Sequence, residues 1–247
     1  MSEVTQSRRT IARAALAVLC GLGAWQLFAG AAHAQAHKPA LHVFLQLDVK
    51  ASALEKTLQE HLPDLAVTVF GRFQDFESSL GEAHPDAVLC ITPVLEYQAT
   101  QVSLQGLRGG KNTEPYILVS SGEPLAGPLD GKTIGVLDLM GRDGTQSFLS
   151  RLLGQGVKAK RVAKMEDLLP LLQFAAADGV VMPTAALARL KERTQLPLKT
   201  RDIPNGQVGL PAVAILNSTA RDLIANAFHS LDAGSNGLLG VDAWSAP

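Results

Sequence analysis

Two kinds of apolar pattern alternate along this chain from residue 41 onward, and the alternation restricts the folds that the chain can adopt. Short apolar runs rich in β-branched residues predict strands at 41–46, 65–70, 86–91, 116–120, 133–137, 158–162, 179–182 and 210–216. Apolar residues at helical spacing predict helices at 52–62, 73–80, 145–153, 166–176, 184–193 and 219–231, with a further helix through Tyr97 and Ala99. Strands and helices that alternate through short connections predict an α/β fold, in which helices cover mostly parallel sheets.

A Pro- and Gly-rich break at residues 121–130 divides this alternation into two lobes. Before the break, residues 103–114 lack periodicity and are expected to form a polar, glycine-rich loop. After the break, the stretch 202–209 (DIPNGQVG) is the natural place for the chain to cross back to the first lobe. We therefore predict a ligand cleft between two lobes, which consist of residues 41–120 with 210–247 and of residues 121–209.

The N-terminal segment has the pattern of a cleavable export signal. A basic stretch with Arg8, Arg9 and Arg13 precedes an apolar run at 14–29, and Ala32-His33-Ala34 is a small-x-small cleavage site. The apolar run is short and interrupted by glycines, which argues against a permanent membrane span. We expect residues 1–34 to be a signal peptide and the mature protein to be periplasmic. The arginine pair fits a twin-arginine signal as well as a general secretory one.

The composition excludes some partners. The chain has 247 residues, a net charge of −1 and no basic stripe, so nucleic acid is not an expected partner. Removal of residues 1–34 leaves Cys90 as the single cysteine of the sequence, in the apolar run 87–91. No internal disulfide is then possible, and Cys90 is expected to be a small buried hydrophobic residue.

The sequence contains no motif that predicts an enzyme. HExxH, GxSxG, paired cysteine ligands and the dinucleotide-binding fingerprint are all missing from it. Asp138 and Asp143 could form a carboxylate pair, but no nucleophile accompanies them. The histidines are scattered without metal-ligand spacing, at His42, His61, His84 and His229. We expect no catalysis, no metal and no cofactor; an exported enzyme is the least favoured alternative.

One stretch, residues 129–153, is the strongest candidate for a binding element. The predicted strand 133–137 leads into Gly141-Arg142-Asp143-Gly144-Thr145, a polar loop that enters the helix 145–153. A helix start carries unpaired N–H groups and partial positive charge, and glycines let a small polar or anionic group approach the backbone. The alternative is that Asp143 or Thr145 only caps the helix and that the two glycines only permit the turn.

Other loops follow the carboxyl ends of predicted strands, where ligands bind in open parallel sheets. They are the segment Gln46-Leu47-Asp48, the dipeptide Thr92-Pro93 and the dipeptide Pro183-Thr184. Thr92 and Thr184, taken singly, are better explained as helix caps. Because several such loops would converge on one cleft, we predict a ligand site formed by Gln46, Thr92, Pro93, Tyr97, Asp138, Gly141, Arg142, Asp143, Gly144, Thr145 and Thr184.

From residue 41 to the end, the chain resembles the periplasmic phosphonate-type substrate-binding proteins of ABC transporters. Three features carry the resemblance: residues 129–136 (LDGKTIGV) followed by the Gly/Asp/Thr loop and 147–149, Thr92-Pro93 with Tyr97 four residues beyond the proline, and the signal peptide. The resemblance implies the two-lobed type II periplasmic binding fold. It also implies a small oxyanion ligand, such as a phosphonate or phosphate ester, and a membrane permease as partner.

The chain departs from that family in the loop itself. Family members that bind phosphonate usually have a Ser/Thr-rich loop, whereas here Thr145 alone offers a hydroxyl and Asp143 opposes an anion unless Arg142 offsets it. Apolar residues surround the predicted site, at Leu137, Leu139, Met140, Met182, Leu47, Val94 and Leu95. A periplasmic lipid or sterol carrier on the same fold is therefore the alternative function. We expect a monomer in either case.

Overall fold

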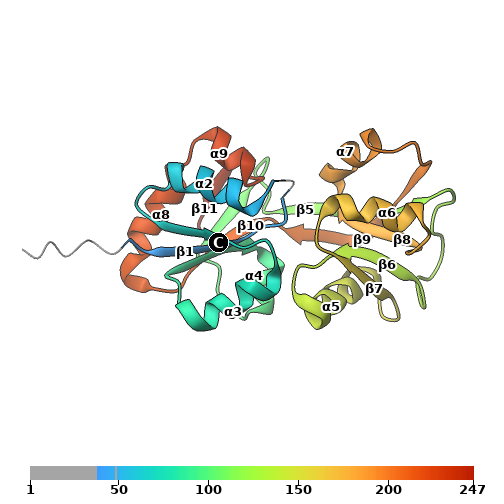
Figure 1. Ribbon diagram of the computed structural model, residues 1–247, viewed down its shortest axis with the longest axis horizontal. Coiled ribbons are helices and arrows are strands. Elements are labelled where there is room, and N and C mark those ends of the chain that lie inside the picture. Colours follow the sequence, from blue (N-terminus) through green and yellow to red (C-terminus); the bar gives the residue numbers. More distant parts are fainter. Residues whose placement is uncertain (1–37, 48) are drawn as a thin grey trace, which may run out of the picture. The chain divides into compact units, whose positions relative to one another are not determined.

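The computed structural model describes residues 38–247 with the exception of Asp48. The predicted signal peptide lies outside the described residues. Two sheets, each covered by helices, account for the described chain, and we call them with their helices the first and the second lobe (Figure 1). None of the described helices is long and apolar enough to cross a membrane.

The first lobe is built on a sheet with the strand order β11-β4-β10-β3-β1-β2. Its strands are β1 (Ala40–Phe44), β2 (Ala66–Val69), β3 (Ala87–Ile91), β4 (Leu104–Leu107), β10 (Pro211–Ile215) and β11 (Ala243–Ser245). Its helices are α2 (Ala51–His61), α3 (Phe73–Ala83), α4 (Thr92–Tyr97), η3 (Ser218–Ala220), α8 (Arg221–His229) and α9 (Ala233–Leu238). The α2, α8 and α9 helices cover one face, and α3 and α4 cover the other (Figure 1).

The second lobe is built on a sheet with the strand order β7-β6-β8-β5-β9. Its strands are β5 (Thr113–Ser121), β6 (Thr133–Leu137), β7 (Lys158–Val162), β8 (Gly179–Pro183) and β9 (Leu198–Gly209). Its helices are α5 (Gly141–Leu153), η1 (Met165–Asp167), α6 (Leu168–Gln173), η2 (Thr184–Ala186) and α7 (Leu187–Glu192). Helix α5 packs on one face of the sheet, and α6 and α7 pack on the other.

Amphipathic patterning positions these helices as the sequence predicts. In α2, Leu54 and Leu58 are buried and pack with the first-lobe strands, while the opposite face of the helix is solvated. In α5, Phe148 and Leu149 are buried in a cluster that also contains Phe44, Phe73 and other residues of the first lobe. One apolar cluster therefore includes residues from both lobes.

The chain passes between the lobes along long strands. β4 continues through a tight turn, closed by a bridge between Arg108 and Lys111, into β5 of the second sheet. β9 pairs antiparallel with β5 and then leads through Leu210 into β10 of the first sheet. A strand that enters a sheet from the other lobe runs antiparallel to the strands of that sheet that are connected by helices. Both sheets are consequently mixed, with β10 antiparallel to β3 and β5 antiparallel to β8.

The structure corrects three details of the prediction. Residues 103–114 are not a featureless loop, because they form β4, its turn and the start of β5. Residues 113–120, grouped with the first lobe, pair within the second sheet as part of β5. The glycine loop 141–144 is the first turn of α5, which begins at Gly141 with φ of 66°. The exact boundaries of the two lobes stay a prediction.

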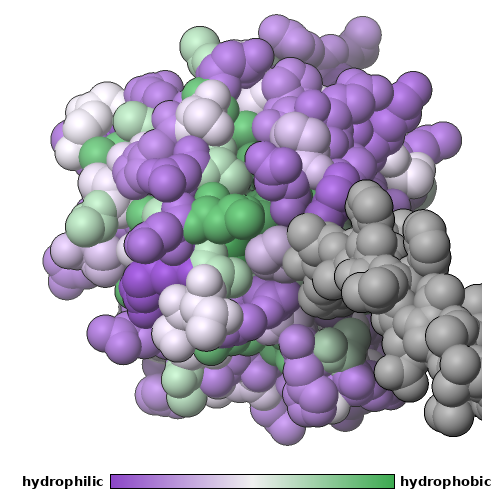
Figure 2. Space-filling view, turned by 90° about the vertical axis from the view of Figure 1, so that its left-hand side faces the viewer, coloured by the Kyte–Doolittle hydropathy of each residue, from purple (hydrophilic) through white to green (hydrophobic). Residues whose placement is uncertain are grey.

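The surface at the first-lobe end of the molecule is largely hydrophilic, with a hydrophobic patch within it (Figure 2). Exposed large hydrophobic residues of the first lobe include Leu216, which follows β10, and Leu223 in α8. Single exposed hydrophobic residues are ordinary on protein surfaces. The cavities near the carboxyl ends of the strands are better candidates for a binding site.

Candidate functional site

A pocket of about 450 Å³ lies between loops of the two lobes. The first lobe contributes the segment after β1, together with Leu54 of α2 and Phe70 and Gly71 after β2. The second lobe contributes residues 163–166, which follow β7, and Arg193. The pocket thus lies beyond the carboxyl ends of parallel strands in both sheets, which is where ligands bind in this class of sheet. We call it the main pocket.

The walls of the main pocket are mostly apolar, and its charged residues are solvated. Glu166 Oε1 lies 3.7 Å from Lys164 Nζ, and Glu166 Oε2 lies 3.5 Å from Arg193 Nη1. All three side chains are more than half exposed, so these ion pairs contribute little to stability. They remain available to contact a ligand at the mouth of the pocket.

A smaller pocket of about 90 Å³ adjoins the main pocket and shares Leu45, Gln46, Leu47 and Met165 with it. We call it the inner pocket. Its polar side chains are those of Gln46, Arg108, Glu114 and Tyr116, and the remaining lining is largely apolar. A few polar groups in a mostly apolar cavity are typical of sites that orient a small ligand.

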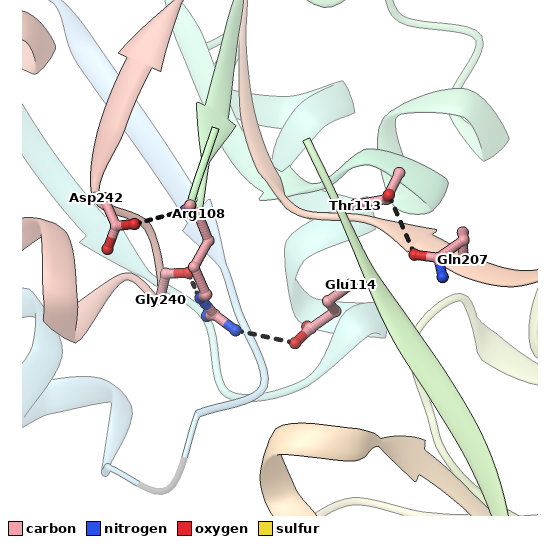
Figure 3. Close-up of polar contacts among 7 residues, drawn as sticks. Arg108, Thr113, Glu114, Gln207, Gly240 and Asp242 are labelled. Atoms are coloured by element: carbon pink, nitrogen blue, oxygen red, sulfur yellow. Dashed lines mark hydrogen bonds and ion pairs between the residues drawn. The ribbon is translucent and has the colours of Figure 1, made fainter. Parts of the chain in front are cut away.

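The Arg108 side chain is held by two partners near the inner pocket (Figure 3). Its Nη1 donates to Glu114 Oε2 at 3.0 Å, and its Nη2 donates to the carbonyl oxygen of Gly240. The backbone N–H of Gly109 donates to Asp242 Oδ2 at 2.7 Å, which fixes the adjoining turn. These contacts join the turn between β4 and β5 to the C-terminal part of the first lobe.

Burial raises the pKa of both titratable groups on β5. Desolvation raises the pKa of Glu114, and the charge and hydrogen bond of Arg108 oppose this rise. Desolvation also raises the pKa of Tyr116, and the nearby carboxylate of Glu114 adds to the effect. Tyr116 is therefore a neutral hydroxyl at physiological pH, able to donate and to accept a hydrogen bond.

The predicted loop around Thr145 forms a self-contained network at the start of α5. Thr145 Oγ1 accepts from the Met140 N–H at 3.1 Å and donates to Asp138 Oδ1 at 3.2 Å. Asp138 Oδ2 in turn accepts from Arg161 Nη1 at 2.5 Å. Thr145 is the fifth residue of α5 and not its N-cap, which is Met140, so the capping role considered for it from the sequence is not what its contacts show. Its fully buried hydroxyl is occupied instead by linking the start of the helix to Asp138.

The other predicted residues occupy three different places. Gln46 lines both the main and the inner pocket. Pro93, Tyr97 and Gly144 line a shallow groove between α4 and α5. The last group lines neither of the two adjoining pockets and comprises Thr92, Asp138, Gly141, Arg142, Asp143, Thr145 and Thr184.

The contacts of this last group are with other residues of the protein, some of them distant in the sequence. The Thr92 hydroxyl donates to the carbonyl oxygen of Leu210 at 2.9 Å. Gly141 lies beside Phe73, and Arg142, Asp143 and Thr184 are exposed. The structure therefore brings Gln46 alone of the predicted residues to the adjoining pockets. The predicted ligand site as a set stays a prediction.

Sequence reasoning missed Arg108, Glu114, Tyr116 and Met165 as pocket residues. Residues 103–114 gave no periodicity, and their two central glycines suggested a loop. A usable signal was present, because Arg108-Gly109-Gly110-Lys111 between two short apolar runs has the form of a hairpin turn. Among residues 38–247, Asp48 excepted, no group of three or more histidine, cysteine, aspartate or glutamate side chains could hold a metal ion.

No protein-family model and no curated protein sequence matches this chain. Solved structures are similar to it in fold. The GluR0 ligand-binding core from Nostoc punctiforme, in complex with L-glutamate, is 15% identical over 82% of this chain and 96% of its own, with a TM-score of 0.57. The periplasmic VFT2 domain of BvgS from Bordetella pertussis is 14% identical over 82% of this chain and 93% of its own, with a TM-score of 0.53.

The substrate-binding protein of an amino acid ABC transporter is also similar, at 18% identity over 81% of this chain and 96% of its own, with a TM-score of 0.51. Identities this low establish the fold and nothing finer. The described residues have the two-lobed type II periplasmic binding fold, as the sequence predicted, with two mixed sheets covered by helices.

Proposed function

We propose that this protein is a periplasmic solute-binding protein, which captures a small organic ligand in the main pocket and presents it to a membrane permease of an ABC transporter. The single observation that carries the proposal is that the main pocket has walls from both lobes. A ligand held there contacts both lobes at once, so its binding energy favours the closed arrangement. A permease can then distinguish the loaded protein from the empty one by its shape.

The ligand class follows from the lining. Leu47, Val49, Phe70 and Met165 offer apolar contact, and Gln46 offers an amide where the two pockets meet. A small organic molecule with an apolar part fits this lining better than a compact oxyanion. The hydroxyl of Thr145, on which a phosphonate site depended in the sequence, is occupied by its own helix start. Phosphonate is therefore not the ligand that we propose.

A periplasmic role is supported by the N-terminal sequence pattern and by similar folds among extracytoplasmic binding domains. A binding role rather than catalysis fits the pocket, because its described polar residues include no nucleophile paired with a base. We propose that the protein acts as a monomer. The apolar walls also favour a second candidate, a lipid carrier, whose ligand would be an acyl chain or sterol.

Native mass spectrometry of the full chain, exported and purified from a bacterial periplasm, tests the proposal. The protein is incubated with a pool of amino acids, alkylamines, short carboxylates, alkylphosphonates and fatty acids. Gly71→Trp and Ala163→Trp fill the main pocket from the first and second lobe. Gly81→Trp is the matched control, because Gly81 is exposed on α3 with open space around its Cα.

We expect the wild-type protein and the control to retain one small organic molecule, and both pocket-filling variants to lose it. A retained fatty acid or sterol would support the carrier instead of the solute receptor. Equal retention by all four proteins would show that the ligand does not lie in the main pocket, and an absence of any bound molecule from the pool would count against both functions.

A further inference from the structure

Three polar side chains line the inner pocket from β5 and from the turn that precedes it. Glu114 and Tyr116 are two residues apart on β5, and Arg108 follows directly after β4. All three line the inner pocket, whose other walls include Phe44, Leu137 and Leu139. Because the inner pocket adjoins the main pocket, a group placed here would be one end of a ligand whose body lies in the main pocket.

Glu114 has an acceptor atom without a partner. Its Oε2 accepts from Arg108, but no described residue donates to its Oε1. A carboxylate can accept several hydrogen bonds, and a partly buried one needs them to offset the loss of water. The Glu114 side chain is 21% exposed, against 39% for Arg108. Glu114 is thus more buried than Arg108, and fewer hydrogen bonds compensate the burial of its charge.

Tyr116 is a second polar group without a partner. The residue is 8% exposed, and its ring packs edge-on against Phe148 with the centroids 6.1 Å apart. Its hydroxyl forms no hydrogen bond with any residue among 38–247, Asp48 excepted. Among the described residues, Ser235 Oγ is the one buried side-chain oxygen without a partner, so the Tyr116 hydroxyl reaches solvent where it lines the inner pocket. A ligand that enters the inner pocket can therefore pair with this hydroxyl and with the open oxygen of Glu114.

Gln46 completes the set at the junction of the two pockets. No described residue hydrogen-bonds its side-chain amide, so its carbonyl oxygen is free to accept. The unfilled acceptors are therefore Glu114 Oε1, the Tyr116 hydroxyl and the Gln46 carbonyl. A carboxylate or phosphonate end group in the same place would oppose Glu114. An ammonium group has three donors and a positive charge, which match a set of acceptors that includes a carboxylate.

We propose that the inner pocket binds a cationic nitrogen through Glu114, Tyr116 and Gln46, and that the ligand is a small organic amine whose apolar body occupies the main pocket. This inference rests on the proposed function and adds the chemical class of the solute. Arg108 acts as a positioning residue, because it holds the Glu114 carboxylate and is itself held by Gly240.

Isothermal titration with two probes of similar shape tests the inference: 3-methylbutylamine and its carboxylate counterpart, 4-methylpentanoate. Glu114→Gln keeps the shape of the side chain and an acceptor for Arg108 but removes the charge. Tyr116→Phe removes the hydroxyl alone. Glu123→Gln is the matched control, because Glu123 is exposed and its carboxylate has no partner among the described residues.

We expect the amine to bind the wild-type protein and the Glu123→Gln control alike. Glu114→Gln should weaken this binding at least about tenfold, and Tyr116→Phe a few-fold, as removal of a charged and a neutral partner implies. Circular dichroism of each variant shows whether it is folded. Retained binding by Glu114→Gln, or no amine binding up to about 10 mM, would overturn the inference.

The two probes also separate this inference from the proposed function. Binding of 4-methylpentanoate but not of the amine, abolished by Gly71→Trp, would support a solute receptor and refute the amine as its ligand. Amine binding that survives Gly71→Trp and Ala163→Trp would place the amine outside the main pocket. That result would contradict both proposals.

Discussion

Arg151 Nη1 of α5 lies 3.2 Å from Glu96 Oε2 of α4, and this ion pair joins the second lobe to the first. The ring of Tyr97 lies in the same groove, over Gly144 at the start of α5. The contact lies away from the main pocket, on the face of the sheets that carries α3, α4 and α5. The lobes are therefore joined in part by side chains that line neither of the adjoining pockets.

Arg151→Ala should lower ligand affinity without touching the ligand. Both members of the ion pair are more than half exposed, so its free energy is at most about 1 kcal/mol. If closure is coupled to binding, the apparent affinity for a main-pocket ligand should fall by no more than about fivefold. Titration calorimetry measures this change, with Arg142→Ala on the same helix as the control. A loss above about tenfold would show that Arg151 has another role.

Gly144→Ala should destabilise the protein. A Cβ at this position would lie 2.5 Å from Met140 Cβ and 2.8 Å from Tyr97 Cε2, so the ring or the helix start must move. We expect a loss of about 1–3 kcal/mol in the free energy of unfolding, measured by urea denaturation. Gly81→Ala in α3 meets no atom within 4 Å and should be neutral or stabilising. Equal effects of the two changes would mean that Tyr97 does not pack on α5.

Thr145→Val should weaken folding while leaving ligand affinity intact. The change leaves the Met140 N–H without its acceptor and Asp138 Oδ1 without its donor, in a fully buried position. Such losses cost about 1–3 kcal/mol of unfolding free energy. Thr184→Val is the control, because Thr184 is exposed and should change stability by less than about 0.5 kcal/mol. If Thr145→Val instead abolished binding in folded protein, the binding role first expected from the sequence would return.

Asp178 should make stability depend on pH. The N–H of Thr133 donates to Asp178 Oδ2 at 2.8 Å and Lys132 Nζ donates to Oδ1 at 3.1 Å, and these contacts lower the pKa of Asp178, the Thr133 bond most. A lowered folded pKa means that the stabilisation is present above the ordinary value of 3.8 and is lost as pH falls through the folded value. Asp178→Asn should therefore reduce stability at pH 7.

The same experiment at lower pH checks the sign. The difference in unfolding free energy between the wild-type protein and Asp178→Asn should shrink below pH 3.8. Asp167→Asn, an exposed carboxylate on η1, serves as the control and should show little difference at either pH. A difference that grows on acidification would contradict the assignment of Asp178 as a stabilising carboxylate.

Much of the fold could be predicted from the sequence because its helices and parallel strands have strong local patterns. Leu54 and Leu58 mark the buried face of α2, and the apolar run 133–137 became β6. The short elements at the C-terminus could not be predicted, because long-range contacts stabilise them. Trp244 of β11 packs on Phe228 with the ring centroids 4.9 Å apart and donates to the Asn236 side chain of α9.

The site was less predictable than the fold. Gln46 could be found because it follows a strand at its carboxyl end, which is a general location for ligands. Arg108 and Glu114 could not, since only the tertiary path of β4 and β5 brings them beside Leu45 and Met165. The glycines at 141 and 144 suggested a loop, whereas the network of Asp138 and Thr145 closes them into a helical turn.

The central claim is that a ligand binds between the lobes in the main pocket, and an NMR titration tests it most directly. The backbone amides of the protein are followed while the small molecule retained in native mass spectrometry is added. We expect residues 45–47 and 49–51 of the first lobe and 163–166 of the second to shift together, with one dissociation constant. Shifts confined to one lobe, or centred on the groove of Tyr97 and Gly144, would contradict the claim.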